Sequence, residues 1–101
     1  MKVTERFQMK KTLNNGRQTF AFTACEANSV QLVGDFTRWL QSPINLRKGA
    51  KGIWRAQVPL TPGTYHYRFL VDGQWHDDPE CVLRVPNPFG SENMVREVKG
   101  D

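Results

Sequence analysis

From residue 18 onward, turn-forming residues interrupt the sequence every eight to twelve residues, and this spacing constrains the fold more than any other feature. Pro62-Gly63 favours a type II turn, because proline fixes φ and glycine accepts positive φ. Asp72-Gly73 is typical of a two-residue hairpin turn. Later prolines exclude a helix and restrict any strand there to a sheet edge: Pro79, Pro86 and Pro88. The chain must therefore fold from short strands.

Between these turns, apolar residues alternate with polar ones, as in strands that bury one face. The expected strands contain Phe20 and Phe22; Ser29–Val33; Trp54, Ala56 and Val58; Tyr65, Tyr67, Phe69 and Val71; and Asn93–Val98. Residues 37–46 are ambiguous, although Pro43 forbids a long helix there. About seven short strands at this spacing predict an all-β antiparallel sandwich of immunoglobulin-like type.

The charge of the chain is unevenly distributed. Residues 1–17 contain five basic residues and one acid, whereas residues 18–101 contain nine of each. We expect residues 1–17 to form a basic N-terminal arm, which is either solvated or in contact with an anionic partner. Residues 18–101 are expected to form a single domain. Because that domain is neutral overall, it is not expected to offer a basic groove for nucleic acid.

Neither a targeting segment nor a metal motif is visible. The first twenty residues lack the apolar segment of a signal peptide, and no apolar run is long enough to span a membrane. A cytoplasmic location is therefore the expectation, with Cys25 and Cys81 as reduced thiols. His66 and His76 are scattered without zinc-ligand spacing, so we expect no metal and no cofactor.

The acidic residues do not indicate a catalytic centre. Glycoside hydrolysis needs two carboxylates facing each other across a cleft, about 5–10 Å apart. Asp77 and Asp78 are adjacent and point to opposite faces of an extended chain. Asp35 and Asp72 occur in turns, where a short acceptor side chain bonds to the backbone. We therefore expect a protein that is not an enzyme.

The three tryptophans differ in their surroundings. Trp54 alternates in phase with Ala56 and Val58, which predicts a core position. Trp39 and Trp75 each follow a turn among polar residues, so their rings are expected to face solvent. An exposed indole matches the apolar C–H face of a pyranose ring. From composition alone, a sugar platform and a pair of partly buried structural tryptophans both remain open.

Seven ordered blocks between residues 18 and 99 resemble the family-48 carbohydrate-binding module, which occurs in the β subunit of AMP-activated protein kinase and in glycogen branching and debranching enzymes. The blocks are Gly34–Trp39, Gly52–Trp54, Leu60–Gly63, Tyr65–Phe69, Val71–Trp75, Asp78-Pro79 and Phe89–Asn93. The resemblance implies an early-set immunoglobulin-like sandwich that binds α-1,4-linked glucan such as glycogen. It also implies the site residues: Trp39 and Trp75 as sugar platforms, Arg68 as a donor to hydroxyls, and Phe89, Ser91 and Asn93 completing the site.

Two positions depart from the kinase module. Arg68 replaces a lysine, which keeps the donors but changes their geometry. Phe89 replaces a leucine at the point that grips the inside of a glucan turn. The alternative function is that of a docking module for a kinase or for a glucan-processing enzyme of the glycoside hydrolase 13 type.

Overall fold

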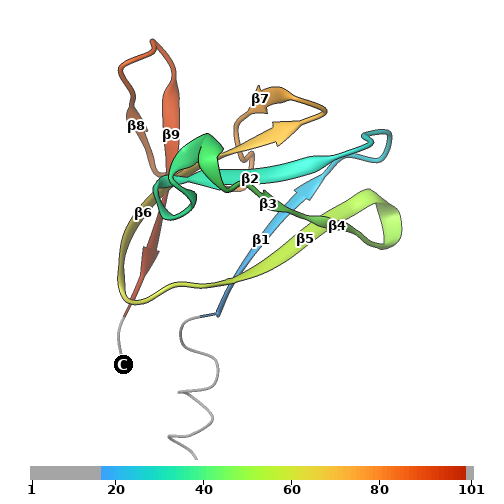
Figure 1. Ribbon diagram of the computed structural model, residues 1–101, viewed down its shortest axis with the longest axis horizontal. Coiled ribbons are helices and arrows are strands. Elements are labelled where there is room, and N and C mark those ends of the chain that lie inside the picture. The colour runs from blue at the N-terminus through green and yellow to red at the C-terminus, as the bar shows by residue number, and fades with distance from the viewer. Residues whose placement is uncertain (1–16, 100–101) are drawn as a thin grey trace, which may run out of the picture.

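A computed structural model describes residues 17–99 as an all-β sandwich of two antiparallel sheets, which confirms the predicted fold class (Figure 1). Its nine strands are β1 (Arg17–Thr23), β2 (Val30–Gly34), β3 (Ile44–Asn45), β4 (Arg47–Lys48), β5 (Ile53–Pro59), β6 (Gly63–Val71), β7 (Gln74–His76), β8 (Arg84–Pro86) and β9 (Glu92–Val98). Three single-turn 3₁₀ helices join them: η1 (Asp35–Thr37), η2 (Trp39–Gln41) and η3 (Ala50–Gly52).

The smaller sheet has the order β1-β5-β4, and the larger has the order β3-β2-β6-β9-β8, with β7 paired to β6. The segment from β3 to β4 passes from one sheet to the other, because Ile44 pairs with Leu32 whereas Arg47 pairs with Arg55. None of the helices within residues 17–99 is long and apolar enough to cross a membrane.

The core lies between the sheets and is formed by the inward faces of the strands that the alternation predicted. Phe20, Tyr67 and Phe69 are fully buried. The Tyr67 ring contacts both phenylalanine rings edge to face. Trp54 is buried as expected, and its Nε1 donates to the carbonyl of Ala24 at 2.9 Å. Because the indole N–H has this partner, burying the ring leaves no polar group unsatisfied.

Two turn predictions have different outcomes. At Asp72-Gly73 both residues have positive φ (51° and 81°), as a type I′ hairpin requires, so this prediction is confirmed. Pro62-Gly63 is not a type II turn, because Gly63 has φ 158° rather than about +80°. Gly63 is instead nearly extended, since it already belongs to β6 and pairs with Val98 of β9.

The ambiguous residues 37–46 resolve into η2 and the two-residue strand β3. Strands of two or three residues also explain why there are nine strands rather than about seven, because hydrophobic alternation cannot reveal so short a strand. The predicted basic arm lies outside the described residues over 1–16, and Arg17, the last residue assigned to it, is the first residue of β1.

Candidate functional site

The hairpin of β6 and β7 brings Arg68 and Trp75 onto the outer face of the larger sheet. Trp75 pairs directly with Leu70, and Arg68 is two residues from Leu70 on the same face. The guanidinium carbon of Arg68 therefore lies 5.3 Å from the centre of the Trp75 ring. Trp75 remains 43% exposed, as expected of a residue that follows a turn.

Arg68 is on the expected face but is not freely exposed, because only 14% of its side chain contacts solvent. Its Nη2 donates to Oδ1 of Asp77 at 3.0 Å, while the other carboxylate oxygen of Asp77 lies 3.5 Å from Arg84. Nε of Arg68 is buried and has no hydrogen-bond partner within residues 17–99. Asp77 thus holds one end of the guanidinium, and Trp75 covers its face.

Trp39 is positioned by an unusual backbone. Arg38 and Trp39 both adopt left-handed conformations, with φ of 54° and 56°, which bulky side chains rarely do. The hydroxyl of the buried Thr37 bonds to the backbone on both sides of this bend: it accepts from Gly34 N at 3.0 Å and lies 2.8 Å from the carbonyl oxygen of Trp39. Trp39 is half-buried, so the expectation that its ring faces solvent holds only in part.

Asn87 organises the loop between β8 and β9. Its Oδ1 accepts from the backbone N–H groups of Phe89 at 2.9 Å and Ser91 at 3.2 Å, and its Nδ2 donates to Oδ1 of Asn93 at 3.1 Å. Phe89 in this loop is 90% exposed. The amide of Asn93 keeps its Nδ2 group for a further hydrogen bond.

These elements surround one groove of about 1000 Å³. All six residues that the resemblance implied line it: Trp39, Arg68, Trp75, Phe89, Ser91 and Asn93. Five further lining residues were not anticipated: Arg38, Leu40, Gln41, Asn87 and Pro88. The turn-forming sequence at Asn87-Pro88 could have indicated the loop between β8 and β9. Nothing in the alternation pattern indicates Leu40, which follows Trp39 in the chain and is exposed.

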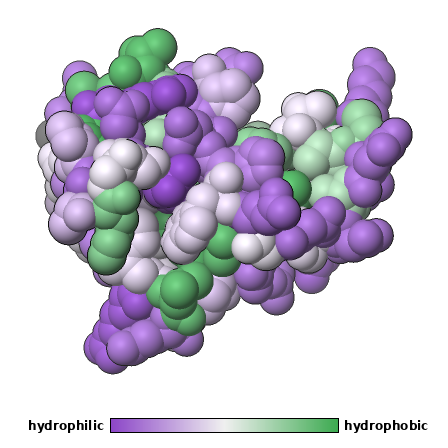
Figure 2. Space-filling view, turned by 90° about the horizontal axis from the view of Figure 1, so that it is seen from above, coloured by the Kyte–Doolittle hydropathy of each residue, from purple (hydrophilic) through white to green (hydrophobic). Residues whose placement is uncertain are grey.

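Apolar residues on the surface viewed from above protrude as separate spots among polar ones (Figure 2). Among residues 17–99, the large apolar residues that are exposed are Leu40, Trp75, Val82, Leu83 and Phe89. Three of these, Leu40, Trp75 and Phe89, belong to the groove. The groove therefore combines exposed apolar surface with a few fixed polar groups, which is the usual make-up of a ligand site.

The acidic residues have the structural roles that the sequence suggested. Asp72 accepts from the backbone N–H groups of Asn28 and Ser29 at 2.8 and 2.9 Å, and Asp35 accepts from the backbone of His66. Asp78 is buried and accepts from the Tyr67 hydroxyl at 2.7 Å. Burial and the Asp78 carboxylate raise the pKa of Tyr67, so its hydroxyl stays protonated and donates.

The chain is similar to known proteins over this region. Residues 16–101 match the family model described as the glycogen recognition site of AMP-activated protein kinase. The chain is 35% identical to phosphoglucan phosphatase LSF1 of Arabidopsis thaliana over 82% of its own length and 14% of that protein. It is 34% identical to the 5'-AMP-activated protein kinase subunit beta-1 of Sus scrofa over 69% of its own length and 54% of that protein.

A bacterial relative is also similar. The chain is 40% identical to the 1,4-alpha-glucan branching enzyme GlgB of Lactiplantibacillus plantarum over 56% of its length, which is 9% of that enzyme. The chain thus spans about half of the kinase subunit, and much less of the phosphatase and of the branching enzyme.

Proposed function

The chain belongs to the family of the glycogen recognition site of AMP-activated protein kinase, and on that premise we propose that it is a non-catalytic module that binds an α-1,4-linked glucan in the groove described above. The observation that supports this proposal is the convergence of all six implied site residues around one groove, although they come from four separate segments of the chain.

The two tryptophans are suited to stack against sugar rings. An axial C–H face of glucose is apolar, and placing it on an indole removes apolar surface of both partners from water. Arg68 covers one face of the Trp75 ring, so a sugar stacks on the opposite face. Trp39 approaches the groove from η2, a separate element, so the two platforms are free to follow a curved chain rather than a flat one.

Hydroxyl recognition falls to Arg68 and Asn93. Nη1 of Arg68 has no hydrogen-bond partner within residues 17–99, and Nδ2 of Asn93 is a further donor among the residues of the same groove. Phe89 is exposed and lines the groove, and we propose that it contacts the inside of a glucan turn. Such a shallow site supports weak binding, with a dissociation constant of about 1 µM to 1 mM.

A docking role is the second candidate function. The chain matches only part of each larger relative, including a kinase subunit and a branching enzyme, so a module of this kind can localise a kinase or a glucan-processing enzyme at its glucan. We propose that such docking also takes place in the cytoplasm, through the groove surface or the basic N-terminal arm. Titration with a soluble glucan separates the two functions, because a module that only docks proteins does not respond to the sugar.

Isothermal titration calorimetry with maltoheptaose and cellohexaose tests the proposal. We expect heat of binding with the α-1,4-linked oligomer and at least tenfold weaker binding of the β-1,4-linked one, because only the curved chain reaches both tryptophans. Equal affinity for the two oligomers would refute the selectivity. No binding of maltoheptaose or β-cyclodextrin at millimolar concentration would leave the docking role as the better explanation.

A further inference from the structure

The central strand of the smaller sheet has an open edge. β5 is seven residues long, but on one side it pairs only with the two residues of β4, through Arg47↔Arg55 and Lys48↔Trp54. Beyond Arg47 the chain leaves this sheet, and Asn45 pairs instead with Gln31 of β2. Residues 56–59 of β5 therefore have no strand beside them on that side within the described part of the chain.

The backbone groups along this edge can be assigned by alternation. The carbonyl of Ile53 accepts from Gly49 N at 2.8 Å, so the polar backbone groups of Ile53 point towards β4. Successive residues of an antiparallel strand point their N–H and C=O groups to alternate sides. The N–H and C=O groups of Gln57 therefore face the open edge, and those of Ala56 face β1.

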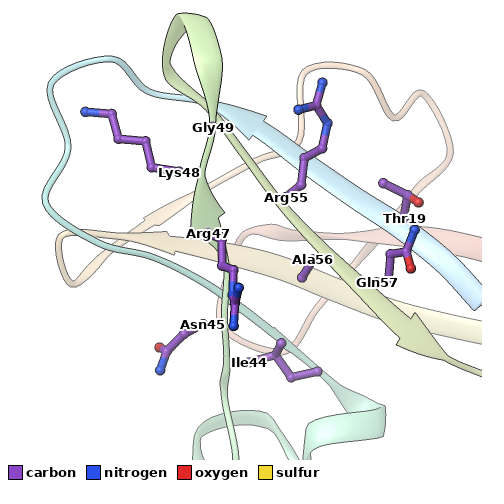
Figure 3. Close-up of a pocket in the computed structure, with 9 residues that line it drawn as sticks. All are labelled: Thr19, Ile44, Asn45, Arg47, Lys48, Gly49, Arg55, Ala56 and Gln57. Carbon is purple, nitrogen blue, oxygen red and sulfur yellow. The ribbon is translucent and has the colours of Figure 1, made fainter.

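A hollow of about 530 Å³ lies along this edge (Figure 3). Its residues are Thr19, Ile44, Asn45, Arg47, Lys48, Gly49, Arg55, Ala56 and Gln57, none of which lines the glucan groove. Nζ of Lys48 is already bound to the carbonyl of Cys25 at 2.8 Å. Arg47 and Arg55 form no ion pair with any described residue, because both ion pairs in residues 17–99 involve Asp77.

The sheet around this hollow is basic. Strands β1, β4 and β5 contain three arginines and one lysine but no Asp or Glu. Arg47 and Arg55 are directly opposite each other, which is unfavourable for like charges, and their side chains extend in different directions (Figure 3). The body is neutral overall, but this sheet carries an excess of basic residues, and no aromatic residue lines the hollow.

We propose that an acidic, extended segment of a partner protein adds to the edge of β5 at Gln57 as a further strand, with its carboxylates beside Arg47 and Arg55. Backbone pairing at an exposed sheet edge is an established way to bind extended peptides. Opposite charge selects the partner, and two guanidinium groups are suited to bind carboxylates.

Other occupants fit less well. Residues 1–16 contain four basic residues and one acid, so like charge disfavours their binding at this surface. A second copy pairing edge to edge would bring like guanidinium groups together. Single-stranded nucleic acid binds through aromatic stacking, and the hollow has no aromatic lining residue.

The test uses an acetylated, amidated octapeptide of alternating glutamate and threonine, titrated into isotope-labelled protein and followed by NMR. We expect the amide of Gln57 to shift most among β5 residues and to exchange more slowly with solvent when peptide is bound. The double variant Arg47→Gln/Arg55→Gln should weaken binding about five- to tenfold, as expected for the loss of two exposed ion pairs. Lys51→Gln is the matched control, because Lys51 lies outside the hollow, and it should bind normally.

Four results would overturn the proposal. Equal binding of a lysine–threonine octapeptide would show that charge does not select the ligand, and equal binding of a peptide N-methylated at every residue would show that no strand forms. Tighter binding of an eight-nucleotide thymidine strand would assign the surface to nucleic acid. If the double variant self-associates while no peptide binds, the arginines serve only to prevent edge-to-edge aggregation. Trp75→Ala should leave peptide binding unchanged, which separates this surface from the glucan groove.

Discussion

The guanidinium carbon of Arg68 lies 5.3 Å from the centre of the Trp75 ring, so the proposed hydroxyl donor and the proposed sugar platform are in direct contact. A positive charge over an indole is attracted by the negative face of the ring and limits the motion of both side chains. Asp77 fixes the other side of the guanidinium at 3.0 Å. The three side chains therefore form one unit, in which removal of the Asp77 carboxylate should alter the position of Arg68 over the Trp75 ring.

Replacing Asp77→Ala tests this unit. We expect maltoheptaose affinity to fall about two- to fivefold, because one partly exposed ion pair that orients Arg68 is lost. Tryptophan fluorescence of the free protein should also change, since Arg68 is released from one fixed position over Trp75. Glu80→Ala is the control, because the Glu80 side chain is exposed and outside the groove. Unchanged affinity and fluorescence in Asp77→Ala would show that Trp75 alone positions the guanidinium.

The three tryptophans should separate binding from stability. Trp75→Ala is expected to abolish measurable glucan binding with little loss of stability, because Trp75 is 43% exposed and lies outside the core. Trp54→Ala should instead destabilise the fold by about 3–5 kcal/mol, since it empties a core site and removes the bond to the Ala24 carbonyl. Trp39→Ala should abolish binding at an intermediate cost in stability, because that ring is half-buried.

Urea denaturation measures the free energy of unfolding of each tryptophan variant, and calorimetry measures its affinity for maltoheptaose on the same samples. If Trp75→Ala unfolds the domain while Trp54→Ala leaves it folded, the assignment of inner and outer tryptophans is reversed.

Asn87→Ala should weaken glucan binding without touching either tryptophan. The Asn87 side chain makes three hydrogen bonds, to Phe89 N, Ser91 N and the amide of Asn93, and all of these disappear together. We expect a loss of affinity of at least fivefold and a destabilisation of about 1–2 kcal/mol, as for a turn side chain that satisfies backbone groups. Asn45→Ala is a control outside the groove. Affinity within twofold of the unmodified protein would show that this loop does not contact the sugar.

The fold is expected to be indifferent to reductant. Cys25 and Cys81 are both free thiols, each lying within 3.6 Å of backbone carbonyl oxygens rather than of another sulfur. Adding dithiothreitol should therefore leave the melting temperature unchanged. A fall of more than a few degrees would indicate a bridge between them, because a disulfide typically adds about 2–4 kcal/mol.

Local sequence rules predicted the elements whose signals are local. The alternation of Phe20 and Phe22, or of Trp54, Ala56 and Val58, is a property of one strand, and so is the positive φ available at Asp72-Gly73. Such signals survive in any tertiary context that buries one face of the strand. The two sheets and the burial of Trp54 could therefore be anticipated.

The groove could not be predicted from local patterns in this way. It joins η2, the β6–β7 hairpin and the loop before β9, which meet only in the folded sandwich, and the family resemblance was needed to group its residues. Asp77 illustrates the limit. Its adjacency to Asp78 says nothing of its partner, because only the register of β6 and β7 brings it to Arg68. The basic edge of β5 could not be recognised from the net charge, because that sum averages the charges of the whole surface.

The left-handed backbone at Trp39 depends on one buried hydroxyl, and Thr37→Val tests that dependence. Thr37 is 3% exposed, and its Oγ1 contacts Gly34 N, Gly34 O and Trp39 O at 3.0, 2.9 and 2.8 Å. Valine fills the same volume but cannot form these bonds, which leaves buried backbone groups unsatisfied. We expect a destabilisation of about 1–3 kcal/mol.

Thr37→Val should also affect the groove. Because positive φ at Trp39 is unfavourable for a bulky residue, loss of the Thr37 contact should let the bend relax and move the indole. Maltoheptaose affinity should then fall in Thr37→Val, and Thr37→Ser should restore it because serine keeps the hydroxyl. Thr61→Val is the surface control, since Thr61 is exposed and outside the groove. If Thr37→Val loses stability but binds glucan normally, the hydroxyl supports the fold alone, and Trp39 is held by its own packing.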